Sequence, residues 1–229
     1  MGVLTLQAAL ALESQRMLKI RVALLLAGLF LLYLAPGCNN YDLLDKLENP
    51  GSGNFTCGSD CRIFVTSNIF SASMGGVHGA DNLCRFDPAN PDGTGRGNWK
   101  AMLVSSNPLR RACDTVNCQV GGASENFDWP LRPNTPYRRP DGIPIGTTSD
   151  KGIFEAELTN SIGTSDVSVW TGLNLEWQTN TTLTCADWTD DITTGLEASA
   201  GLDTAVTNSA ISLATVFCTE GHRLYCVEQ

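Results

Sequence analysis

The side chains best suited to chemistry in this sequence are nine cysteines and two histidines. A thiol beside an imidazole can act as a nucleophile, and both groups bind zinc at suitable spacing. The two closest cysteine pairs, however, have three and four intervening residues, whereas thioredoxin-like and zinc-ribbon sites have two. These pairs are Cys57 with Cys61 and Cys113 with Cys118. The spacing favours disulfide bonds over redox or metal chemistry, so we predict no cofactor and no metal site.

Other catalytic patterns are absent from the sequence. It contains no Gly-x-Ser-x-Gly elbow, no His-Glu-x-x-His pair and no phosphate-binding Gly-x4-Gly-Lys-Ser/Thr loop. Asp190 and Asp191 are adjacent, so on a strand their side chains diverge instead of facing one substrate. A fully disulfide-bonded set of cysteines leaves no thiol for His78 or His222 to activate. We therefore predict that the protein is not an enzyme.

An apolar run near the start indicates export. Residues 22–35 carry no charge and follow Lys19 and Arg21, as in a signal peptide. A membrane-spanning helix needs about 20 apolar residues, so this run is too short to span a bilayer. We expect residues 1–37 to be a signal peptide, and translation to start at Met17, which would give a leader of ordinary length.

The end of this run resembles a relaxed bacterial lipobox, Leu-Ala-Pro-Gly-Cys at residues 34–38, in which the cysteine is acylated after cleavage. Ala35 and Pro36 depart from the strict pattern, and ordinary cleavage that leaves a thiol at Cys38 is the alternative. Two or three acyl chains anchor a protein durably in a membrane. We expect Cys38 to be lipidated, residues 38–61 to form the lipidated N-terminus and a flexible linker, and the protein to lie at the outer membrane or cell surface.

Composition and local patterns predict one α+β domain over residues 62–229. Charged residues are only 17% of the chain, and glycine is abundant, which favours short strands and loops. Turn-forming residues fill the segment 86–98. The remaining patterns predict a helix at residues 79–85 and strands at 63–66, 99–104, 167–172 and 223–227. With lipid on Cys38, eight cysteines remain for disulfides, and spacing alone leaves their connectivity open.

The charge distribution suggests what the domain binds. The formal net charge of −9 disfavours nucleic acid as a partner. Residues 85–139 nevertheless hold eight basic and five acidic side chains, against two and twelve in residues 150–229. One interpretation is an anion-binding face for a sulfated glycan or an acidic protein, and the alternative is solvated loop charges. The arginines of that face would be Arg110, Arg111, Arg138 and Arg139.

Tryptophans offer a second kind of binding residue. Trp99, Trp170 and Trp188 fall in strand or motif positions and are expected in the core. Trp129 and Trp177 lie in loop-like sequence, where either could stack on a sugar or anchor a protein partner, with loop packing as the alternative.

Several motifs together resemble a known family. The segment Gly-Gly-Val-His-Gly-Ala-Asp-Asn-Leu-Cys at residues 75–84, followed by Trp-Lys-Ala-Met-Leu-Val-Ser-Ser at 99–106, is similar to the opening of endostatin-type domains. Later elements are similar in the same order, namely Val-Trp-Thr-Gly at 169–172, Cys-Ala-Asp-Trp at 185–188, and the closing cysteines. The chain resembles still more closely an uncharacterised domain of spirochaetal surface lipoproteins. Four elements carry this resemblance, namely residues 79–84, 145–154, 169–172 and 224–229.

The resemblance implies a C-type-lectin-like, endostatin-like fold that is stabilised by disulfides and rich in loops. It also implies that Cys84 pairs with Cys226 and Cys185 with Cys218, which leaves Cys57 with Cys61 and Cys113 with Cys118. The calcium-binding motifs of lectins and the histidine cluster of endostatin are missing, so neither metal is expected.

The function we expect is that of a non-catalytic, adhesin-type binding module. Its partners would be the membrane, through the lipid anchor, and an extracellular-matrix protein or sulfated glycan. The alternatives are a structural envelope lipoprotein without a soluble ligand and a binder of the cell's own polysaccharide.

Overall fold

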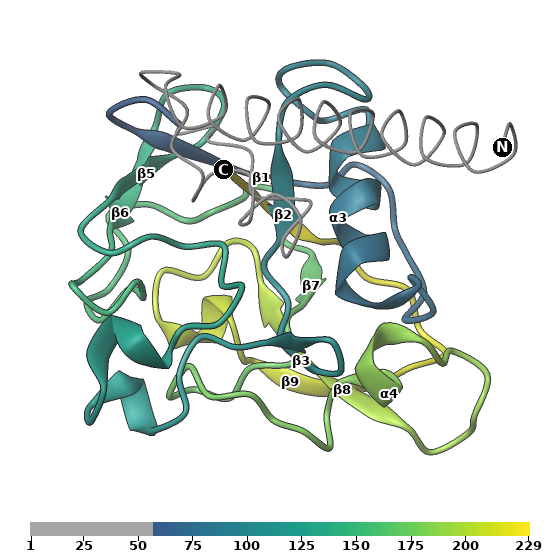
Figure 1. The fold of residues 1–229 in the computed structure, drawn as a ribbon. Helices are drawn as coiled ribbons and strands as arrows, with labels where there is room; N and C mark the ends of the chain where they lie inside the picture. The colour runs from purple at the N-terminus through teal and green to yellow at the C-terminus, as the bar shows by residue number, and fades with distance from the viewer. Residues whose placement is uncertain (1–56) are drawn as a thin grey trace, which may run out of the picture. The chain divides into compact units, whose positions relative to one another are not determined.

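Residues 61–65, Cys-Arg-Ile-Phe-Val, form the central strand of the main sheet (Figure 1). The computed structural model describes residues 57–229. Several predictions made from the sequence fall outside the described residues. They are the start at Met17, the leader, the lipidation site Cys38 and most of the linker. No helix within residues 57–229 is long and apolar enough to cross a membrane.

The main sheet has five strands in the order β2-β10-β1-β5-β6. β1 (Cys61–Val65) runs antiparallel to β10 (Tyr225–Glu228) and parallel to β5 (Pro136–Arg138). β2 (Trp99–Ala101) and β6 (Pro144–Thr147) complete the edges. Because β1 and β10 are neighbours, the first and last strands of the domain are joined by hydrogen bonds.

Two smaller antiparallel sheets complete the strand content. β7 (Ser168–Trp170), β8 (Glu197–Leu202) and β9 (Ala214–Phe217) form a three-stranded sheet in that order. β3 (Ser105–Ser106) and β4 (Leu109–Arg110) form a short hairpin. Much of the remaining chain is loop.

The one long described helix is α3 (Gly76–Phe86), which lies beside β2 (Figure 1). It buries Val77, Ala80 and Cys84. A Cβ atom on Gly79 would lie 1.8 Å from the Met74 carbonyl oxygen, so only glycine fits there. The other described helices are single turns, namely α4 (Cys185–Trp188) and three 3-10 turns at Val116–Cys118, Gly122–Glu125 and Asn208–Ala210.

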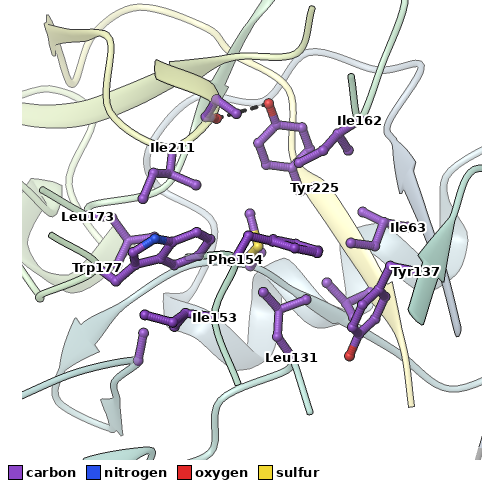
Figure 2. Packing of buried hydrophobic residues seen from close by; sticks show 14 of the residues in the cluster. Ile63, Leu131, Tyr137, Ile153, Phe154, Ile162, Leu173, Trp177, Ile211 and Tyr225 are labelled. Atoms are coloured by element: carbon purple, nitrogen blue, oxygen red, sulfur yellow. Dashed lines mark hydrogen bonds between the residues drawn. The ribbon is translucent and has the colours of Figure 1, made fainter. Parts of the chain in front are cut away.

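Two apolar clusters cover the two faces of the main sheet, because alternate residues of a strand point to opposite sides. Ile63 and Tyr137 belong to the first cluster, which surrounds Phe154 (Figure 2). Phe64 belongs to the second, with the α3 residues and with Trp99, whose ring meets Phe64 edge-on at 4.9 Å between centroids. The main sheet is therefore buried on both sides over much of its area.

Four disulfides hold the described part of the chain together: Cys57–Cys61, Cys84–Cys226, Cys113–Cys118 and Cys185–Cys218. These are the pairs that the resemblance implies. Cys84–Cys226 joins α3 to β10 across 142 residues, and a loop of that length corresponds to about 5 kcal/mol of unfolded-chain entropy. The structure is thus a mixed, sheet-rich and loop-rich single domain with few helices and several disulfides.

An arginine-lined cleft as candidate functional site

Arg110 is not part of a binding surface, which corrects the expectation of a four-arginine face. Its side chain is completely buried. The guanidinium donates to both carboxylate oxygens of Asp81 at 2.8 Å and to Asp128 Oδ2 at 2.6 and 2.8 Å. Burial works against the charged form, but the two carboxylates raise the pKa of Arg110 overall. Lys100 also pairs with Asp128, so this network is structural and unavailable to a ligand.

Trp129 and Trp177 are core residues, which corrects their expected role in stacking on a ligand. Their exposed fractions are 8% and 2%. The two rings meet edge-on at 6.4 Å, and Trp177 also packs against Phe154 in the first cluster (Figure 2). A sugar or a protein partner therefore cannot stack on either ring.

Arg111 is tied to a separate loop. Its Nη1 lies 3.2 Å from Asp114, and its Nε donates to the Glu125 carbonyl. The Glu125 carboxylate in turn accepts hydrogen bonds from Thr115, Gly121 and Asp114 of the same loop. Burial acts to raise the pKa of Glu125, but these hydrogen bonds lower it to about 2.

Arg138 and Arg139 lie at the end of β5, and each lines a cleft. The cleft that contains Arg139 has a volume of about 250 Å3 and lies at the C-terminal end of β1. Its wall also includes an arginine that the sequence analysis did not select, Arg223. The remaining lining residues are Phe64, Val65, Ala89, Pro140, Asp141, Ile162, Gly163, Thr164, Ser165 and Asp203.

Arg223 is a half-buried cation whose side chain has no partner in the part of the chain that the structure describes. Its Nε is shielded from solvent and has no hydrogen-bond acceptor, and its guanidinium makes no ion pair within residues 57–229. The backbone of Arg223 is nevertheless fixed, because its N–H donates to Ser168 O and its carbonyl accepts from Trp170 N. A positive charge held in this way is suited to bind an anion.

Arg139 faces the same cleft but has a partner of its own. Residues 139–142 form the turn between β5 and β6, in which Gly142 N–H donates to Arg139 O. Within this turn Arg139 Nη2 lies 3.3 Å from Asp141 Oδ2, and its Nη1 donates to Ser161 O at 3.4 Å. Asp141 is 57% exposed, so an incoming anion can compete with it for Arg139.

The second carboxylate of the cleft, Asp203, is already committed to the backbone. Its oxygens accept hydrogen bonds from Ser165 N at 3.1 Å and Val167 N at 2.8 Å. Asp203 is completely buried and forms no ion pair with Arg223. These hydrogen bonds hold Asp203 in the wall of the cleft. Its carboxylate therefore does not neutralise the guanidinium of Arg223 by an ion pair.

His222 precedes Arg223 and forms a chain of contacts that sequence analysis did not predict. Its Nδ1 contacts the Ser168 hydroxyl, and its Nε2 lies 3.4 Å from Glu220 Oε2, which is an ion-pair distance without hydrogen-bond geometry. The ring also meets Trp170 edge-on at 4.3 Å. Burial lowers the pKa of His222, and Glu220 opposes this effect. These contacts hold His222, and therefore the backbone of Arg223, against β7.

Histidine and carboxylate groups do not assemble elsewhere into a metal centre. No group of three or more His, Cys, Asp or Glu residues within the described range 57–229 could hold a metal ion. His78 is 70% exposed and lies 4.0 Å from Asp81 on α3.

Fold and cleft together define a disulfide-stabilised, sheet-rich domain with an arginine-lined surface cleft. The chain belongs to the family described as "Protein of unknown function (DUF1554)", whose match covers residues 67–205, more than half of its length. The matched segment includes Arg139 and Asp203, which both line the cleft, whereas Arg223 lies beyond the end of the matched segment. No curated protein matches the chain.

A signal for Arg223 was present in the sequence. It is the only arginine after residue 139, in a segment with twelve acidic side chains. An isolated arginine among carboxylates ordinarily forms ion pairs, so its lack of a partner emerged only from the structure.

Proposed function

We propose that this protein is an exported, lipid-anchored and non-catalytic binding module that binds an anionic extracellular ligand in the cleft of Arg139 and Arg223. The observation that carries the proposal is the half-buried guanidinium of Arg223, which lines the cleft and forms no ion pair within residues 57–229. An arginine without a paired carboxylate keeps its positive charge in the cleft, and a bound sulfate or carboxylate would pair with that charge. The ligand class is a sulfated glycan or an acidic patch of a matrix protein.

We also propose that the domain has the endostatin-like, C-type-lectin-like fold. The support is the position of two disulfides, one from the first helix to the last strand and one between Cys185 and Cys218. Anchoring through Cys38 at the outer membrane or cell surface rests on the leader sequence. Mass spectrometry of the mature N-terminus tests the anchor, because an unmodified thiol at Cys38 would contradict it.

Binding is tested with the disulfide-bonded mature protein on immobilised heparin and on matrix proteins. Arg223→Met and Arg139→Met should each weaken binding about tenfold, because each removes a charge-assisted hydrogen-bond donor from the cleft. Arg96→Met is the matched control, since Arg96 is exposed and lines neither arginine cleft.

The outcomes of this experiment separate the proposal from its alternatives. Salt-sensitive binding that falls in the two cleft variants and not in Arg96→Met supports the proposal. Absence of binding to every anionic probe would contradict it and favour a structural envelope role. Binding that is unchanged in Arg223→Met would remove the cleft as its site.

A further inference from the structure

A second cleft adjoins the first along β1. It has a volume of about 280 Å3 and is lined by Gly58, Ser59, Asp60, Arg62, Arg138 and Glu228. Arg62 lies in this cleft and Phe64 in the other. These residues are two positions apart on β1, so they point to the same face about 7 Å from each other. The two clefts therefore lie next to each other along β1.

The second cleft also contains an arginine whose side chain has no partner among the described residues. Arg138 is half-buried and makes no side-chain hydrogen bond or ion pair with the described residues. It is the register partner of Arg62 in the parallel pair of β1 and β5. Arg62, by contrast, is saturated, because it pairs with both Glu228 and Asp92. The difference leaves Arg138 as the available cation.

The acidic side chains at and beside the second cleft differ in how strongly they repel an incoming anion. Glu228, which lines the cleft, and Asp92, which does not, both pair with the single guanidinium of Arg62, so these three side chains together keep one negative charge. Asp60 is exposed and forms no ion pair within residues 57–229, so it opposes an incoming anion. The site therefore has a free positive group, Arg138, and one removable negative group, Asp60.

From this arrangement we propose that the ligand is a linear polyanion of the sulfated-glycan class whose successive charged groups occupy both clefts, one at Arg138 and one at Arg139 and Arg223. This inference rests on the proposed function. Arg138 and Arg139 are consecutive, with Cα atoms about 3.8 Å apart, yet each lines a different cleft. A single small anion can reach one cleft, whereas a chain with repeated charges can reach both.

Probe length distinguishes one cleft from two. The mature protein is titrated with a monosulfated disaccharide and with a long heparin oligosaccharide, at several salt concentrations. Arg223→Met should weaken both probes about tenfold, whereas Arg138→Met should weaken only the long probe, by a similar factor. Arg138→Met should also reduce the salt dependence of the long probe by about one released counterion. Asp60→Asn should strengthen binding of the long probe alone.

Each outcome decides a different claim. If Arg138→Met leaves long-heparin binding unchanged while Arg223→Met weakens both probes, the two-cleft inference is wrong and the proposed function stands. If the parent protein binds neither probe and no acidic matrix protein, the proposed function fails and this inference fails with it. If an acidic protein binds through both arginines but heparin does not, the ligand class is wrong. Melting temperatures equal to that of Arg96→Met show that the variants are folded.

Discussion

Replacing Arg110 by methionine should destabilise the domain strongly without touching the binding cleft. The side chain is fully buried and donates to Asp81, to Asp128 and to the Ala101 carbonyl. Methionine preserves much of the volume but leaves two carboxylates, only 18% and 15% exposed, without their guanidinium partner. Breaking a buried ion pair in this way costs about 3–5 kcal/mol. For a domain of this size, that corresponds to roughly 6–20 °C in melting temperature.

The size of the effect should depend on pH. Burial acts to raise the pKa of Asp128, but Arg110 and Lys100 lower it overall. A lowered folded-state pKa stabilises the protein above the unfolded value of about 3.9, and this contribution is lost as the pH falls below it. In Arg110→Met, the carboxylates become less costly once they are protonated. The stability gap between parent and variant should therefore narrow in acid.

Urea denaturation followed by circular dichroism, with disulfides intact, measures this gap at pH 7 and pH 3. Arg96→Met controls for the loss of one exposed cation, and Asp81→Asn combined with Asp128→Asn should recover part of the loss in the Arg110→Met background. A variant within about 1 kcal/mol of the parent would refute the argument, because surface ion pairs contribute only that much. Such a result would mean that the Arg110 side chain is exposed to solvent.

Three further changes test other parts of the structure. Ala186 is exposed and has φ of 52°, so Ala186→Gly should stabilise the domain by about 0.5–1 kcal/mol in thermal denaturation; destabilisation would contradict this backbone conformation. Glu125→Gln should lower the free energy of unfolding by about 1–3 kcal/mol at pH 7. Because the pKa of Glu125 is lowered to about 2, the parent should lose this contribution as the pH falls from about 4.5 towards 2, and equal pH profiles for parent and variant would argue against it. Asp141→Asn should strengthen heparin binding severalfold by freeing Arg139, and weaker binding would show that Asp141 positions Arg139 instead of competing for it.

Local patterns predicted the elements that have a clear pattern of apolar residues of their own. The expected helix at 79–85 lies inside α3, which extends over Gly76–Phe86, and the expected strands at 63–66 and 223–227 overlap β1 and β10. The strand expected at 99–104 ends at Ala101, because Leu103 N–H turns back to donate to Ala101 O.

Elements and sites that depend on distant contacts were not predictable. β8 is a run of small residues, Glu-Ala-Ser-Ala-Gly-Leu, that lacks a strand pattern but fits a crowded site. A Cβ on its Gly201 would lie 1.9 Å from the Ala210 carbonyl oxygen. Arg110 was misassigned because its partners Asp81 and Asp128 lie 29 and 18 residues away. Charge and residue type identified arginine as the binding group, but only packing separates a buried arginine from an unpaired one.

The most direct test of anion binding in the cleft observes the Arg223 Nε–H group itself. In 15N-labelled mature protein, the arginine Nε–H resonances are followed during titration with a long heparin oligosaccharide and assigned by the Arg223→Met and Arg139→Met variants. The account predicts saturable shifts of the Arg223 and Arg139 resonances, with Arg110 unchanged. Saturable heparin binding that leaves the Arg223 resonance in place would contradict it.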